Sequence, residues 1–145
     1  MSAVSTRPSS ELGTELPTKT IELTPTFVIS TAIASRDFED VHHDISAAQR
    51  AGLDNVFLNI LTTSGICQQY VIEWAGPATI IEKSSLRLGL PAIAGDTLTL
   101  AGTVSAREST GEGRERLEVT VEANVTSGRH ASAIVTCTVP ESEAP

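Results

Sequence analysis

Hydrophobic side chains recur at steps of three and four along residues 56–74, the longest stretch of helical spacing in the chain. The spacing begins at Phe57 and Ile60, and other apolar residues occupy the remaining faces of the same stretch. A helix that is apolar nearly all round is buried in a folded protein. The pattern therefore predicts a long central helix over 56–74, which ends before Gly76 and Pro77.

The segments around this helix carry the patterns of β-strands. Residues 117–125 alternate between apolar and polar side chains, which is typical of a strand with one buried face. A strand is also expected at 26–34, because β-branched residues are frequent there and Pro25 precedes them. The strands expected after the helix are 79–89, 97–104, 117–125 and 131–139.

A polar turn at residues 35–44 follows the first expected strand and leads into a short helix at 45–51. Asp44 has the side chain of an N-cap residue, and Gly52 is the residue type that closes many helices. Antiparallel strands with one segregated buried helix define an α+β fold. The economical arrangement is a single hot-dog fold, in which a curved antiparallel sheet wraps around the long helix.

The 145 residues are expected to form one domain with polar ends. Residues 1–20 and 140–145 have few large apolar side chains, so we expect a flexible N-terminal arm and a flexible tail. The folded hot-dog domain is expected to span 21–139. A single sheet of this kind leaves an uncovered edge, so we also expect dimerisation.

Composition and charge narrow the class of protein. A net charge of −8 argues against nucleic-acid binding, because the chain would repel phosphate. No apolar stretch is long enough to cross a membrane, and the first residues lack the basic start and apolar core of a signal peptide. Two cysteines, Cys67 and Cys137, are too few for a disulfide framework. These features predict a cytoplasmic protein without membrane attachment.

The polar turn concentrates the chemistry of the chain, with four carboxylates and two imidazoles within residues 37–44. Asp37 and His42 can both reach one water molecule, and each can act as acid or base near neutral pH. Water addition to an α,β-unsaturated thioester needs such a pair, together with N–H donors at a helix N-terminus for the enolate oxygen. A solvated capping turn is the alternative explanation. Zinc is not expected, because Cys67 and Cys137 lie far from this turn in sequence.

The segment from Ser35 to Gly52 resembles, without a gap, the signature of the MaoC-like or (R)-specific enoyl-CoA hydratase family. A second match is the Pro and Gly-Asp-Thr turn within 86–98, and the resemblance covers about residues 26–139. It implies a hot-dog hydratase that uses neither a metal nor an organic cofactor. The matching signature residues are Ser35, Asp37, Val41, His42, Asp44, Ala48 and Gly52. Departures that indicate a divergent branch are Arg36, Glu39, Asp40 and Ile45.

The resemblance also implies roles for individual residues. Asp37 and His42 match the residues that activate water in the family, so these two are the expected catalytic pair. The family glycine that supplies an oxyanion N–H falls on Ile60, and we expect Ile60 and its neighbour Asn59 to contact substrate. Arg87 is the candidate for binding a CoA phosphate, with a solvated surface arginine as the alternative.

A closer resemblance links segments 31–44, 59–62 and 73–77 to the small MaoC-like subunits of actinobacterial steroid side-chain enoyl-CoA hydratases. It implies a steroid acyl-CoA thioester substrate, met during cholesterol degradation. It also implies a larger MaoC-like partner subunit, which completes the acyl-CoA pocket in a hetero-oligomer. The sequence by itself leaves the acyl chain open, and does not decide between hetero-oligomer and homodimer.

Two other functions fit the same fold. The chain would be a non-catalytic acyl-CoA-binding subunit if Asp37 and His42 served only structure. It would be a hot-dog thioesterase if Glu73 on the long helix were the reacting carboxylate. The helix dipole argues against Glu73, because the C-terminal end disfavours a negative charge. Outside these candidates, His130 is expected at the surface.

Overall fold

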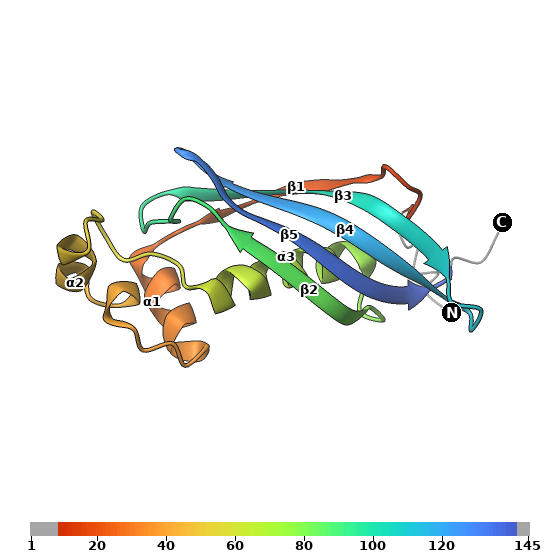
Figure 1. Ribbon diagram of the computed structural model, residues 1–145, viewed down its shortest axis with the longest axis horizontal. Coiled ribbons are helices and arrows are strands. Elements are labelled where there is room, and N and C mark those ends of the chain that lie inside the picture. Colours follow the sequence, from red (N-terminus) through yellow and green to blue (C-terminus); the bar gives the residue numbers. More distant parts are fainter. Residues whose placement is uncertain (1–8, 142–145) are drawn as a thin grey trace, which may run out of the picture.

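Five antiparallel strands form one sheet in the order β1-β3-β4-β5-β2 (Figure 1). The computed structural model describes residues 9–141. The strands are β1 (Glu15–Glu22), β2 (Ile80–Leu88), β3 (Thr97–Ser109), β4 (Arg114–Val125) and β5 (Gly128–Pro140). The helices are α1 (Pro25–Ala34), α2 (Ile45–Arg50) and α3 (Ile60–Ala75), with one 3-10 turn, η1 (Asp40–His42).

The long helix α3 packs along one face of the sheet, α1 lies near the start of α3, and α2 lies beyond one end of the strands (Figure 1). Every second residue of β4 points into the core, so that Leu117, Val119 and Val121 are at most 1% exposed. Cys67 and Val71 of α3 are fully buried in the same core. Each large apolar side chain buried in this way stabilises the fold by roughly 1.5–3 kcal/mol. The predicted α+β hot-dog fold is confirmed.

Helix α3 begins four residues later than the apolar spacing predicts. The Asn59 side chain caps it by accepting a hydrogen bond of 3.1 Å from the Thr62 N–H. Val56 and Leu58, which continue the apolar pattern, instead lie in an extended segment that bonds to residues 92–94. The Leu58 N–H donates to Ala92 O at 2.9 Å, and the Ala94 N–H donates to Val56 O at the same distance. Burial and not helix formation explains the apolar character of Val56 and Leu58.

The strand predicted at 26–34 is wrong, because these residues form helix α1. Thr24 is the N-cap, and its Oγ1 accepts a hydrogen bond of 3.0 Å from the Phe27 N–H. Pro25 stands at the first helical position, where its fixed φ favours the helix. Val28 and Ala32, four residues apart, are the buried contacts of α1. The β-branched residues misled the prediction, because a cap and tertiary packing outweigh their weak preference for strands.

The flexible arm predicted at 1–20 is too long, because residues 15–20 belong to edge strand β1. Leu16 is 4% exposed, and the Tyr70 hydroxyl donates to Pro17 O at 2.8 Å. Polar side chains dominate β1 because most of its residues face solvent at the edge of the sheet. Residues 1–8 of the expected arm and residues 142–145 of the expected tail lie outside the described residues. No helix within residues 9–141 is long and apolar enough to cross a membrane.

His130 is buried, contrary to the surface position expected from the sequence. It is 3% exposed at the start of β5. Its Nδ1 lies 2.7 Å from Leu90 O, and because a carbonyl can only accept, Nδ1 carries the hydrogen. Nε2 therefore accepts from the Thr63 hydroxyl at 2.8 Å, which ties β5 to α3. Burial lowers the pKa of His130, because the charged imidazolium loses its hydration.

The buried His130 predicts a loss of stability in mild acid. The unfolded chain binds a proton at this imidazole below the ordinary pKa of 6.5, whereas the folded chain resists it. The free energy of unfolding should therefore fall as the pH drops below that value, by at most about 1.4 kcal/mol per pH unit for one proton. Urea unfolding at several pH values measures this slope. In His130→Asn the slope between about pH 6.5 and pH 5 should flatten, and an unchanged slope would contradict the assignment.

Candidate active site

The turn between α1 and α2 brings Asp37 and His42 together. Nε2 of His42 lies 3.7 Å from Oδ2 of Asp37. Both side chains are largely covered, with exposed fractions of 11% for His42 and 25% for Asp37. The distance is too long for a direct hydrogen bond. The two polar atoms thus lie close together without a direct hydrogen bond.

His42 is held in one orientation by the segment that precedes α3. Its Nδ1 lies 2.8 Å from Phe57 O. The carbonyl can only accept, so Nδ1 carries a hydrogen, and in the neutral imidazole Nε2 has its lone pair directed toward Asp37. The Phe57 ring packs edge-on against the imidazole, with ring centroids 4.7 Å apart. This contact restrains the tilt of the imidazole.

Asp37 is held ionised by hydrogen bonds to both of its oxygens. Asn59 Nδ2 donates to Oδ2 at 3.0 Å, and the Glu39 N–H donates to Oδ1 at 3.3 Å. The Asn59 bond is the main cause that lowers the pKa of Asp37, against a smaller opposing effect of desolvation. When His42 is protonated, its positive charge also favours the charged form of Asp37. Asp37 is therefore an acceptor of hydrogen bonds at neutral pH.

Asn59 links three parts of the structure and is 2% exposed. Its Nδ2 donates to Asp37 and also to Ser35 Oγ at 2.8 Å. Its Oδ1 caps α3 through the Thr62 N–H. Both hydrogens of the amide group are committed to protein partners, so the geometry makes Asn59 a positioning residue for Asp37. Asparagine is a common N-cap residue, so the sequence contained a signal for this role. The signal was missed because the helix was expected to begin at residue 56, which placed Asn59 inside it.

A left-handed residue turns the backbone just before Asp37. Arg36 has φ of 57°, the one positive φ on a non-glycine residue within 9–141. Such a conformation costs an ordinary L-residue about 1–2 kcal/mol, and the family signature has glycine here. The turn is fixed by the Asp37 N–H, which donates to Ala32 O at 3.0 Å, and by the Ser35 hydroxyl, which donates to Thr31 O at 2.8 Å.

The other predicted site residues lie at different distances from this pair. Ile60 is the first residue of α3 and is 52% exposed. Its N–H has no partner inside the helix, as for any first-turn residue. Arg87 lies on β2 opposite Ser132, on the face of the sheet that points away from α3. The structure therefore places Ile60 beside Asn59 and keeps Arg87 apart from the Asp37–His42 pair.

Glu73, the residue of the thioesterase alternative, lies in the last turns of α3, far along the helix from its N-terminus. It forms an ion pair of 2.6 Å with Lys19 and accepts a hydrogen bond from Gln69. These bonds lower the pKa of Glu73, with Lys19 as the largest cause. Within residues 9–141, no group of three or more His, Cys, Asp or Glu side chains is arranged to hold a metal ion.

The pair has the geometry to hold one water molecule. Nε2 of His42 and Oδ2 of Asp37 both accept hydrogen bonds, and they lie 3.7 Å apart. A water about 2.8 Å from each atom would donate one hydrogen to each. Its oxygen lone pairs would then point away from the protein, toward an electrophile. The arrangement can thus orient a water and remove its proton.

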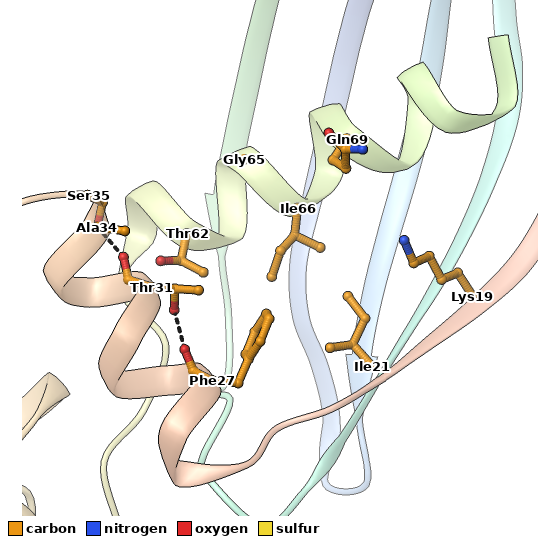
Figure 2. A pocket seen from close by; sticks show the side chains of 10 residues that line it. All are labelled: Lys19, Ile21, Phe27, Thr31, Ala34, Ser35, Thr62, Gly65, Ile66 and Gln69. Carbon is orange, nitrogen blue, oxygen red and sulfur yellow. Dashed lines mark hydrogen bonds between the residues drawn. The ribbon is translucent and has the colours of Figure 1, made fainter. Parts of the chain in front are cut away.

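A cavity of about 470 Å³ lies beside this cluster, between α1, α3 and β1 (Figure 2). Ser35 and Thr62 form part of its wall, and both are hydrogen-bonded to Asn59. Figure 2 shows Phe27, Ile66 and Ile21 converging on its middle. The cavity is therefore apolar and adjoins the residue that positions Asp37.

The curved sheet around one helix, with the Asp37–His42 turn beside the N-terminus of that helix, defines a hot-dog protein. The family model described as "MaoC like domain" matches residues 8–128. The chain belongs to this MaoC-like family. It is 42% identical over 131 residues to the 3-oxo-4,17-pregnadiene-20-carboxyl-CoA hydratase beta subunit of Mycobacterium tuberculosis, covering 90% of this chain and 98% of that protein.

Solved structures agree with this family. The crystal structure of the ChsH1-ChsH2 complex from Mycobacterium tuberculosis contains a chain with 40% identity and a TM-score of 0.82, and the match covers 90% of this chain and 99% of that chain. The (R)-hydratase from A. caviae involved in PHA biosynthesis is 19% identical with a TM-score of 0.79, covering 90% of this chain and 97% of that chain. The second likeness shows the shared fold.

Asn59 can be tested by separating its two roles. Asn59→Ala removes both the helix cap and the donor to Asp37, whereas Asn59→Ser keeps a capping oxygen but is too short to reach Asp37. We expect the pKa of Asp37 to rise in both variants, as measured by carboxyl NMR titration. Only Asn59→Ala should lose the cap, at a cost of about 1 kcal/mol in the free energy of unfolding. A pKa that stays low in both variants would show that Asn59 does not control Asp37.

Proposed function

We propose that this chain is the catalytic subunit of an enoyl-CoA hydratase, which adds water to the α,β-double bond of a steroid side-chain acyl-CoA thioester. The observation that carries the proposal is the pair of acceptors, Nε2 of His42 and Oδ2 of Asp37, 3.7 Å apart. The substrate class is supported by the relative at 42% identity, whose name specifies a steroid carboxyl-CoA hydratase. The (R)-hydratase, at 19% identity, supports only the fold.

In the proposed reaction, His42 is the base and Asp37 orients the water. The water oxygen bonds to Cβ while one of its protons passes to Nε2 of His42. The negatively charged carboxylate of Asp37 stabilises the imidazolium that results. Cα then takes up a proton from the pair, so one water is added in total and both side chains end as they began. The same steps in reverse remove water.

The enolate oxygen that develops on the thioester needs hydrogen-bond donors. The first turn of α3 supplies them, because the Ile60 N–H has no partner within the helix and the helix N-terminus is electropositive. Ile60 follows Asn59 directly in the chain, which places this N–H next to the residue that holds Asp37. A backbone donor is compatible with the isoleucine side chain. We assign the Ile60 N–H to the thioester oxygen.

A second, larger MaoC-like subunit is proposed to complete the site. Large apolar side chains next in sequence to Asp37 and Asn59 are exposed, with exposed fractions of 63% for Phe38, 52% for Ile60 and 54% for Leu61. Large exposed apolar residues gathered around a functional site are typical of a surface that another chain covers. The relative is named a beta subunit, and the similar structure is a complex of two proteins. Both support a hetero-oligomer.

The catalytic pair is tested by substitution in the assembled complex. Asp37→Asn and His42→Ala should each lower the hydration rate of a steroid enoyl-CoA by about 10²–10⁴-fold, because each removes one acid–base partner. The loss of enoyl absorbance measures the rate. Asp40→Asn is the matched control, since Asp40 is an exposed carboxylate in the same turn that points to His43. It should retain the wild-type rate.

The same assay separates the alternatives. Full activity in both Asp37→Asn and His42→Ala would place the chemistry in another chain and make this chain a binding subunit. Release of free CoA from a saturated acyl-CoA, abolished by Glu73→Gln, would identify a thioesterase instead. Circular dichroism and the mass of the complex show whether each variant is folded and assembled.

Arg87 is proposed to bind a CoA phosphate from the outer face of the sheet. It lines a groove there with Arg129, whose guanidinium is paired with Glu122 at 2.7 Å. Because β2 is an edge strand, a pantetheine arm can pass around it from the α3 side. Arg87→Ala should raise KM for the CoA thioester several-fold and leave kcat unchanged. With the N-acetylcysteamine thioester, which lacks phosphates, the variant should behave like wild type, and equal losses with both substrates would rule out this role.

A further inference from the structure

We propose that His43 is a positioning residue for Asp37, which it holds through the peptide unit that follows Phe38. This inference rests on the proposed function, because it explains how the carboxylate that orients the water is kept in place. His43 follows His42 directly in the chain, but the two rings face different groups. Nε2 of His42 faces Asp37, whereas Nε2 of His43 lies 3.2 Å from the Phe38 carbonyl oxygen.

The peptide unit between Phe38 and Glu39 is hydrogen-bonded on both sides. Its carbonyl oxygen, on Phe38, accepts from Nε2 of His43 at 3.2 Å. Its N–H, on Glu39, donates to Oδ1 of Asp37 at 3.3 Å. A trans peptide unit is planar, so its C=O and N–H groups point in opposite directions and move as one rigid unit. The bond from His43 therefore fixes the direction in which the Glu39 N–H points.

The ring of His43 acts as a hydrogen-bond donor at this carbonyl. A carbonyl oxygen can only accept, so Nε2 of His43 carries a hydrogen. In neutral His42 the hydrogen is on Nδ1, and Nε2 is an acceptor. The two adjacent imidazoles thus carry their hydrogens on opposite nitrogens. Protonation of His43 adds a hydrogen to Nδ1 and leaves the bond from Nε2 in place.

The backbone hydrogen bonds of the turn begin beyond this peptide unit. The N–H groups of residues 42–44 donate to the carbonyls of Glu39 and Asp40 at 2.8–3.1 Å, which closes the 3-10 turn η1. None of these bonds involves the Phe38 carbonyl, and within residues 9–141 Nε2 of His43 is its one donor. Without this bond the peptide unit would be free to rotate away from the carboxylate.

The orientation of this peptide unit matters because each oxygen of Asp37 has its own donor. Asn59 holds Oδ2, and the Glu39 N–H holds Oδ1. The last torsion of an aspartate is broad, so a carboxylate held at one oxygen can turn about it. Such a turn changes the distance of 3.7 Å between Oδ2 and Nε2 of His42. The second donor therefore fixes the plane of the carboxylate at the position where it can share a water.

Two substitutions of His43 separate its N–H from its ring. His43→Gln keeps an N–H donor at about the position of Nε2, whereas His43→Phe keeps a ring of similar size without a donor. The side chain is 31% exposed, so neither change disturbs the core. The matched control is Asp40→Asn, which alters the exposed carboxylate 3.7 Å from the same ring nitrogen.

Carboxyl NMR titration of Asp37 in the full chain measures the effect without an activity assay. We expect the pKa of Asp37 to rise in His43→Phe, because the charged carboxylate loses the Glu39 N–H. The pKa should stay at the wild-type value in His43→Gln and close to it in Asp40→Asn. The amide resonance of Glu39 should move in His43→Phe alone.

Hydration rates in the complex with the partner subunit extend the test to the reaction. His43→Phe should lower kcat for a steroid enoyl-CoA by about 10–100-fold, the loss expected when a catalytic group is slightly misplaced. Its KM should stay within about twofold of wild type, because His43 makes no contact with substrate in this proposal. The acid limb of the pH profile should move to higher pH, since the ionised form of Asp37 is then lost earlier on acidification. His43→Gln should restore kcat to within about threefold of wild type.

The outcomes separate this inference from the proposed function. An Asp37 pKa or a kcat that is the same in wild type and His43→Phe would overturn the inference. Equal changes in His43→Phe and His43→Gln, with both variants folded by circular dichroism, would also overturn it, because the ring and not its N–H would then be responsible. If the pKa of Asp37 responds as expected but the wild-type complex hydrates no steroid enoyl-CoA, the proposed function fails and the link from His43 to Asp37 stands.

Discussion

The hydrogen bonds of the Asn59 amide join the fold to the candidate chemistry. One amide nitrogen donates to Asp37 and to Ser35, and the amide oxygen caps α3. The same group therefore fixes where the central helix begins, where α1 ends and which way the carboxylate points. Asn59 is 2% exposed, so water does not compete for these hydrogen bonds. Each bond is therefore stronger than the same bond would be at the surface.

This dependence explains why the site lies at the N-terminus of α3. The helix is held against the sheet by its apolar face and by the Thr63–His130 hydrogen bond of 2.8 Å. The segment before it pairs with residues 92–94, and this segment supplies the Phe57 carbonyl that orients His42. The turn thus receives its geometry from the elements that are packed against it. The left-handed backbone of Arg36 is an unfavourable conformation, and it places Asp37 within reach of these neighbours.

The sequence predicted the long helix and the four later strands because their periodicity is long and regular. It failed at Pro25–Ala34, where the β-branched residues suggest a strand but the Thr24 cap and packing of Val28 produce a helix. It failed at residues 15–20, where an edge strand needs few apolar side chains. Boundaries were least accurate, since Val56 and Leu58 are buried in a bridge that joins residues distant in sequence.

The candidate site, like the fold, could be predicted from the sequence only in part. Asp37 and His42 lie five residues apart, so their proximity follows from the local turn and could be predicted. The partners that orient them come from Phe57 and Asn59, about 15 and 22 residues further along the chain, and no local pattern specifies those contacts. Arg87 is separated from the pair because alternate residues of a strand point to opposite faces, and only the sheet register decides which face is which.

Solvent access decides how strongly the pair can act. Asp37 is 25% exposed in the single chain, and the apolar side chains of Phe38, Ile60 and Leu61, which adjoin Asp37 and Asn59 in the sequence, are exposed as well. Water at this surface screens the attraction between the carboxylate and an imidazolium that forms on His42. A partner that buries these apolar residues would remove that water and strengthen the attraction severalfold. In the proposed hydratase, assembly and catalysis would then be linked by one physical cause, because burial of this surface would both favour association and stabilise the charged intermediate.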